Sequence, residues 1–169
     1  MIQIRNAREG EADLLTEIGL RAWQRAMAAI GETDTLLEAA GNAFKTFTQS
    51  AWLTITVVEQ NGVIAGWAAR EALDENISDF WIAPSHLRQG LGSALLERIE
   101  KDIAGQGFEK AALQTHSANA EAIEFFRKHG YAIQWLSVAY SPKLDRDVPS
   151  VGLVKQLVSD DNGTYGPSI

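Results

Sequence analysis

Cysteine is absent from this chain of 169 residues, and histidine occurs only three times. Without cysteine there can be no disulfide, no thiolate metal ligand and no cysteine nucleophile. The histidines, at positions 86, 116 and 129, are too dispersed for a zinc-binding spacing such as H-E-x-x-H. We therefore expect no metal site, and the composition fits a reducing, cytoplasmic location.

Long hydrophobic runs and basic clusters are missing as well. No apolar stretch approaches the roughly 20 residues of a membrane-spanning helix, and the first five residues lack the apolar core of a signal peptide. Acidic residues outnumber basic ones by 22 to 15, which gives a net charge of −7. Such a field repels nucleic acid and attracts cations, so we expect neither a nucleic-acid nor a membrane partner, whereas an amine ligand suits it.

Hydrophobic periodicity predicts one domain, residues 1–158, followed by a polar, frayed tail at 159–169. Expected strands are 2–6, 53–59, 63–70, 76–82, 111–115, 131–140 and 151–158, and expected helices are 11–29, 35–48, 90–104 and 117–129. Asn61-Gly62 is a strong hairpin signal between the second and third strands. The order β-α-α-β-β-β-α-β-α-β-β predicts a mixed α/β (α+β) fold, with a central sheet of about seven strands flanked by about four helices.

The segment Leu87-Arg88-Gln89-Gly90-Leu91-Gly92-Ser93 leads from a predicted strand into a predicted helix. Gly90 and Gly92 leave the main chain accessible to a bulky anion, and the first helical turn offers unpaired N–H groups with a favourable dipole. On the residues alone, a diphosphate site and a plain tight turn both remain open. No Lys-Ser or Lys-Thr follows, which excludes a Walker loop, and Leu95 replaces the third glycine of a dinucleotide fingerprint.

This segment resembles the signature Q/R-x-x-G-x-G/A of the GNAT superfamily of acetyl-CoA-dependent N-acyltransferases. Downstream, residues 119–131 (NAEAIEFFRKHGY) resemble the family's second cofactor segment, N-x-x-A-x-x-x-Y-x-x-x-G-F. The order of elements is similar too, so the resemblance spans nearly the whole chain. It implies transfer of the acetyl group of acetyl-CoA directly to a primary amine, on a small molecule or a peptide. Since relatives are often dimers, it also implies a possible homodimer.

The resemblance also implies roles for individual residues. The strand segment Phe80, Trp81 and Ile82 would pair with the pantetheine arm, Asn119 would bond the pantetheine or position the thioester, and Phe126 would border the sulfur. Main-chain N–H groups would hold the diphosphate at Arg88, Gln89, Gly90, Leu91, Gly92 and Ser93. Trp23 would line the acceptor pocket, because the segment around it resembles the family's acceptor-side helix.

Two positions depart from the family pattern. Leu87 stands where the signature has Gln or Arg, so the neighbouring Arg88 becomes the candidate source of positive charge. Phe126 stands where many members have a tyrosine that protonates the departing thiolate, and phenylalanine has no proton to give.

The general base is not determined by the sequence. Asp79 lies on the strand beside the expected cofactor site, His116 follows the fifth strand and has a suitable ordinary pKa, and Glu75 lies in the preceding loop. All three stay candidates. Because the base is open and Phe126 lacks a hydroxyl, a domain that binds acetyl-CoA as a signal without catalysis is the alternative to an enzyme.

Overall fold

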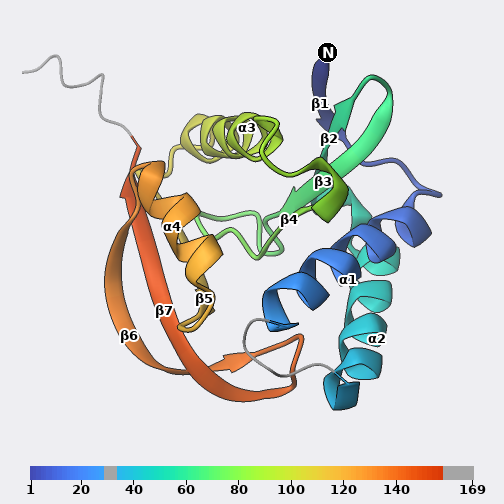
Figure 1. Cartoon of the computed structure of the whole chain (residues 1–169). Helices are drawn as coiled ribbons and strands as arrows, with labels where there is room; N and C mark the ends of the chain where they lie inside the picture. Colours follow the sequence, from blue (N-terminus) through green and yellow to red (C-terminus); the bar gives the residue numbers. More distant parts are fainter. Residues whose placement is uncertain (29–33, 158–169) are drawn as a thin grey trace, which may run out of the picture.

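The computed structural model describes residues 1–28 and 34–157, which form seven strands and four α-helices (Figure 1). In chain order the elements are β1 (Ile2–Asn6), α1 (Ala12–Ala28), α2 (Asp34–Ser50), β2 (Ile55–Gln60), β3 (Val63–Ala69), β4 (Asp79–Ile82), α3 (Leu91–Gly105), β5 (Lys110–His116), α4 (Ala120–Lys128), β6 (Ala132–Ser141) and β7 (Arg146–Gln156). This confirms the predicted fold class and order of elements. No helix in the described part of the chain is long and apolar enough to cross a membrane.

The first sheet has the strand order β1-β2-β3-β4, with every neighbouring pair antiparallel. Helices cover both of its faces: α1 and α2 lie on one side and α3 on the other (Figure 1). Successive residues therefore enter different cores, as Val57 packs with α1 and α2 while Val58 packs with α3. Asn61 and Gly62, both with positive φ (54° and 83°), form the predicted hairpin turn between β2 and β3.

The second sheet has the order β5-β7-β6 and is also antiparallel. Helix α4 packs against it through Phe126, which shares a core with Val151 and Leu153 of β7. The tip of the long β6–β7 hairpin turns toward α1 and α2, where Leu144 and Val148 join the other core (Figure 1). One hairpin thus connects the two cores.

Within residues 1–28 and 34–157, main-chain pairing between the two sheets is limited to an isolated parallel bridge, Asn76 with Ala112. Main-chain hydrogen bonds there join Ile77 N–H to the Ala112 carbonyl (2.8 Å) and Ala112 N–H to the Glu75 carbonyl (3.0 Å). Beyond the bridge β4 and β5 belong to different sheets, so each presents an unpaired strand edge to the space between them. The predicted central sheet of about seven strands is thus divided into a four-stranded and a three-stranded sheet.

Several element ends differ from the prediction. A short 3-10 helix at Trp52–Thr54 precedes β2, and β4 begins at Asp79 rather than at residue 76. Helix α4 begins three residues later than predicted, because Asn119 is its N-cap, and β7 begins earlier, at Arg146. Ala29, Val158 and the predicted tail at 159–169 lie outside the described residues.

Candidate active site

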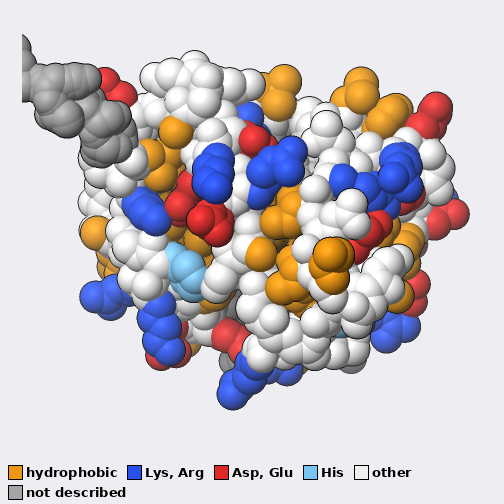
Figure 2. All heavy atoms as spheres, turned by 90° about the horizontal axis from the view of Figure 1, so that it is seen from above, with side chains coloured by type: hydrophobic (Ala, Val, Ile, Leu, Met, Phe, Trp, Pro, Cys, Tyr) orange, Lys and Arg blue, Asp and Glu red, His pale blue; other side chains and the backbone are white. Residues whose placement is uncertain are grey.

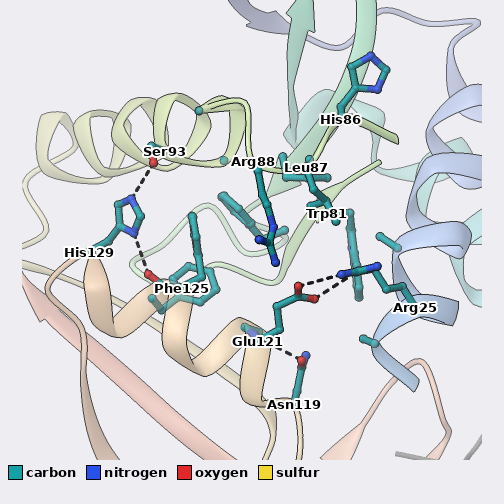
Figure 3. Close-up of a pocket in the computed structure, with 18 residues that line it drawn as sticks. Arg25, Trp81, His86, Leu87, Arg88, Ser93, Asn119, Glu121, Phe125 and His129 are labelled. Carbon is teal, nitrogen blue, oxygen red and sulfur yellow. Dashed lines mark hydrogen bonds and ion pairs between the residues drawn. The ribbon is translucent and has the colours of Figure 1, made fainter. Parts of the chain in front are cut away.

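A pocket of about 380 Å³ opens between β4, the loop before α3, and α4, with α1 across its mouth (Figure 3). Its lining includes nine of the eleven predicted cofactor residues, namely Phe80, Trp81, Ile82, Arg88, Gly90, Gly92, Ser93, Asn119 and Phe126. The other two predicted residues do not line it, since Gln89 is exposed and Leu91 is buried in the core. We call this cavity the first pocket.

The two glycines of the turn meet different requirements. Gly90 is the N-cap of α3 with φ 80°, a left-handed conformation that favours glycine, and a Cβ there would meet no atom within 4 Å. At Gly92 a Cβ would lie 3.2 Å from the Phe125 ring, so this glycine allows α4 to approach α3 closely. No side chain caps α3, so the N–H groups of its first turn are available to a ligand at the pocket.

Arg88 is the basic side chain closest in sequence to this turn. Its backbone is left-handed (φ 63°), an uncommon conformation for a residue other than glycine, and Figure 3 shows its side chain extending from the α3 loop into the first pocket. Leu87 lines the same pocket. The arginine therefore carries positive charge into the pocket from the position next to the one that the signature predicts.

Helix α4 contributes Asn119 and Phe126 to the first pocket. The Asn119 side chain accepts a hydrogen bond from Ala122 N–H (3.4 Å) and donates one to Thr115 Oγ1 (3.2 Å). Phe126 is buried and packs edge-on against Phe80 at 5.4 Å between ring centroids. The neighbouring Tyr131 does not replace the missing hydroxyl, because its OH donates to Glu100 (2.8 Å) and burial raises its pKa.

An ion pair crosses the mouth of the first pocket. Arg25 of α1 reaches Glu121 of α4 at 3.1 Å, and Figure 3 shows the two side chains meeting beside Trp81. The hydrogen bonds that Arg25 donates to the Glu121 carboxylate raise the pKa of Arg25. Since both side chains are about half exposed, their contribution to stability is small. The pair instead defines the boundary of the pocket.

A second pocket, of about 170 Å³, lies behind the first one. Its walls come from α1, β4, β5 and the β6–β7 hairpin, and they include the predicted acceptor residue Trp23 and the candidate base His116. Ala26, Trp81 and Asn119 line both pockets. Molecules held in the two pockets would therefore meet at these three residues.

Asp79 is buried beneath the second pocket and is already paired. Its Oδ1 accepts hydrogen bonds from Lys143 Nζ (2.9 Å) and from Trp81 Nε1 (3.0 Å). The lysine ammonium also lies 4.8 Å from the centroid of the Phe44 ring, a favourable cation–π distance. The contacts of this carboxylate thus stabilise its charge and hold the hairpin on β4, and they do not favour proton abstraction.

The other two candidate bases lie in different places. His116 lines the second pocket, and its Nδ1 accepts a hydrogen bond from Ala118 N–H at 3.0 Å. In a neutral imidazole the proton then resides on Nε2, which makes that nitrogen a donor. Glu75 lines neither pocket and belongs to a separate surface depression beside β5 and β6.

The surface charges on one face of the molecule are mixed. On the face shown in Figure 2, Lys and Arg side chains stand beside Asp and Glu and do not gather into one basic patch. Among residues 1–28 and 34–157, no group of three or more His, Asp or Glu side chains is arranged to hold a metal ion.

Comparison with known families decides what kind of protein carries these pockets. The model of the acetyltransferase (GNAT) family matches residues 18–131. The chain belongs to the GNAT family. The match covers helix α1 from Ile18 onward, both glycines of the α3 turn and the whole of α4, so it includes all residues that line the first pocket.

Individual GNAT proteins show how far the similarity extends. The [ribosomal protein bS18]-alanine N-acetyltransferase of Escherichia coli K12 is 32% identical over 88 residues, which are 51% of this chain and 60% of that protein. A GCN5-related N-acetyltransferase from Rhodopseudomonas palustris has the same fold, with a TM-score of 0.77 at 19% identity over 92% of this chain and 95% of that one. The PaiA N-acetyltransferase of Thermoplasma acidophilum, solved with coenzyme A, gives a TM-score of 0.71 at 19% identity over 92% and 99%.

Some residues of this GNAT site were not predicted from the sequence. Arg25, Glu121 and His129 line the first pocket, and Lys143, Leu144 and Val148 of the hairpin line the second. His129 bridges two helices, since it contacts Ser93 at 2.8 Å and the Phe125 carbonyl at 2.7 Å. Glu121 and His129 lay inside the recognised segment 119–131, but the segment assigned neither of them a role. The hairpin residues carry no local signal, because tertiary packing brings them to the site.

Proposed function

We propose that the chain is an N-acetyltransferase that uses acetyl-CoA as its cosubstrate and a primary amine as its acceptor. The observation that carries the proposal is the junction of the two pockets at Ala26, Trp81 and Asn119. In the transfer a C–N bond forms and the thioester C–S bond breaks. The ammonium loses two protons, one to solution and one to the thiolate sulfur, so that the amide, free thiol and one released proton balance.

The residues present fit acetyl-CoA. Strand β4 is the edge of its sheet, so the main chain of Phe80, Trp81 and Ile82 has unpaired groups that suit the amides of a pantetheine arm. The uncapped first turn of α3 suits a diphosphate. Arg88 would add the charge that Leu87 lacks. That the acetyltransferase of Thermoplasma acidophilum was solved with coenzyme A supports this assignment.

For the acid and base steps, the contacts favour some candidates over others. The Asp79 carboxylate is engaged by Lys143 and Trp81, and Glu75 lies away from both pockets. His116 is the candidate that lines the acceptor side, where its Nε2 is a hydrogen-bond donor in the neutral ring. We therefore propose His116 as a residue that contacts the acceptor.

A sensor that binds acetyl-CoA without transferring the acetyl group is the second candidate. Phe126, which supplies no proton at the thiolate position, favours it. Release of free thiol in the presence of amines distinguishes the two, because a sensor would bind the cosubstrate and release none.

We also propose a cytoplasmic homodimer. Strand β6 is the edge of its sheet and contains no charged residue, so two antiparallel copies could pair without repulsion. It carries five of the exposed large hydrophobic side chains, at Ile133, Trp135, Leu136, Val138 and Tyr140. Analytical ultracentrifugation tests this: a dimer that Leu136→Lys dissociates is expected, and a monomer at every concentration would contradict it.

Thermal unfolding with and without acetyl-CoA tests the cosubstrate. At about 100 times the dissociation constant, binding adds about 2.7 kcal/mol to the free energy of unfolding, so the melting temperature should rise clearly. Adenosine, which lacks the diphosphate and the pantetheine arm, is the control and should give a smaller rise. No rise at millimolar acetyl-CoA would refute the proposal.

A further inference from the structure

The second pocket is smaller than the first. Its volume of about 170 Å³ equals the space of about six water molecules at roughly 30 Å³ each. Pockets for drug-sized ligands are larger, about 300–1,000 Å³. The cavity therefore suits a compact acceptor whose amine points toward Trp81 and Asn119.

The described lining of this pocket contains no aspartate or glutamate. Lys143 is its charged side chain, and the 2.9 Å ion pair with Asp79 neutralises that charge. An acceptor with a second ammonium group, such as a polyamine, would find no carboxylate there to balance it. The burial of Asp79, at 4% exposure, keeps that carboxylate out of reach.

Hydrogen-bond donors are present in the same wall. His116 presents Nε2–H, because its Nδ1 already accepts the Ala118 N–H. The Ser141 hydroxyl and the Lys143 ammonium line the pocket as well. Donors in a partly buried wall without acidic side chains favour an anionic group on the ligand.

We propose that the second pocket binds a small amine that also carries an anionic group, an amino acid or an analogue of one. Its amine faces the first pocket at Trp81 and Asn119, and its carboxylate accepts a hydrogen bond from His116 Nε2. Trp23 and Leu144 enclose the side chain. This inference rests on the proposed function and adds to it the class of acceptor and the residue that selects it.

The test compares each amino acid with the amine that remains when its carboxylate is removed. Free thiol release from acetyl-CoA is measured for alanine against ethylamine, leucine against isoamylamine, phenylalanine against phenethylamine, and the other common amino acids likewise. Spermidine and a trialanine peptide represent polyamines and protein N-termini. For the preferred amino acid, kcat/KM should exceed that of its matched amine at least about tenfold, as a hydrogen bond to a charged group warrants.

Two substitutions at His116 identify the selecting contact. His116→Leu removes the donor and should raise KM for the amino acid about 10- to 100-fold with kcat largely retained. His116→Gln restores an N–H donor and should recover part of the loss. Both variants are first checked for the thermal shift with acetyl-CoA, so that a misfolded protein is recognised.

The outcomes separate the inference from the function on which it rests. Equal turnover of amino acids and matched amines, or preference for spermidine or the peptide, would overturn the inference and leave the N-acetyltransferase intact. So would a loss in His116→Leu that falls on kcat alone. A thermal shift with acetyl-CoA but no thiol release from any amine would overturn both the transfer reaction and the inference, and would establish the sensor.

Discussion

The two pockets of this protein are built in different ways. The first is lined by β4, the glycine turn of α3, α1 and α4, and the groups proposed to bind acetyl-CoA there are mostly main-chain groups of β4 and the α3 turn. The second is formed by side chains from α1, β4, β5 and the tip of the β6–β7 hairpin, and an ion pair holds that tip in place. Binding through main-chain groups tolerates most side-chain changes, whereas binding through side chains depends on each contact that positions them.

The largest expected effect is at the ion pair beneath the second pocket. Lys143→Met leaves Asp79 buried without its partner, which should lower the free energy of unfolding by about 3–5 kcal/mol. Urea denaturation measures it, with Lys45→Met on the exposed face of α2 as the matched control. The double variant Asp79→Asn with Lys143→Met removes both charges and should regain most of the loss. A loss below about 1 kcal/mol in the single variant would show that the pair does not hold the hairpin.

The next largest effect is expected in the first pocket. Gly90→Leu places a side chain at the turn where the diphosphate is proposed to bind, and it should remove the gain of about 2.7 kcal/mol that excess acetyl-CoA provides. Gly62→Leu is the matched control, because Gly62 has nearly the same φ (83° against 80°) and equally open surroundings but lies in the β2–β3 turn. Both should lose similar stability without ligand, about 1–2 kcal/mol. If both kept the thermal shift, the glycine turn would not bind the cosubstrate.

A smaller effect is expected outside both pockets. Glu11 joins Arg5 at 2.7 Å, and this hydrogen bond lowers the pKa of the Glu11 carboxyl below its ordinary value of about 4.3. Because its pKa is lower in the folded state than in the unfolded state, ionised Glu11 stabilises the fold at pH values above its ordinary pKa. This stabilisation is lost as the pH falls through the lowered pKa. Glu11→Gln should therefore cost about 1–2 kcal/mol at pH 7 and little at pH 3, measured by denaturation at both pH values.

The exposed Glu9 is the control for this prediction, since Glu9→Gln should change stability by less than about 0.5 kcal/mol. Because the Arg5–Glu11 contact touches neither pocket, Glu11→Gln should leave the thermal shift with acetyl-CoA unchanged. A cost at pH 3 as large as that at pH 7 would mean that charge on Glu11 does not stabilise the fold.

The sequence predicted the first pocket far better than the second. Gly90, Gly92 and Asn119 act through the local backbone, and a strand-to-helix turn or an N-cap can be recognised from neighbouring residues alone. Lys143 contacts Asp79 across 64 positions, and nothing near either residue in the sequence indicates that contact. Asp79 was predicted as a base candidate from its strand position, but the lysine that engages it could come only from the tertiary structure.

The fold shows the same contrast. Periodicity and the Asn61-Gly62 turn located all seven strands and four helices, because these signals repeat within one element. The strands separate into two sheets because the chain before β4 pairs with β5 at the bridge between Asn76 and Ala112, and β4 itself does not pair with β5. Such long-range pairing leaves no periodic signal, although it creates the space that both pockets occupy.

Trp81 stands in the wall shared by the two pockets, which gives the protein an intrinsic optical reporter. Its indole would sense a ligand on either side, so its fluorescence can reveal the order in which two ligands arrive. Five tryptophans emit together in this chain, and subtracting the spectrum of a Trp81→Phe variant isolates the one at the junction. The kinetics of binding can thus be followed without attaching any label.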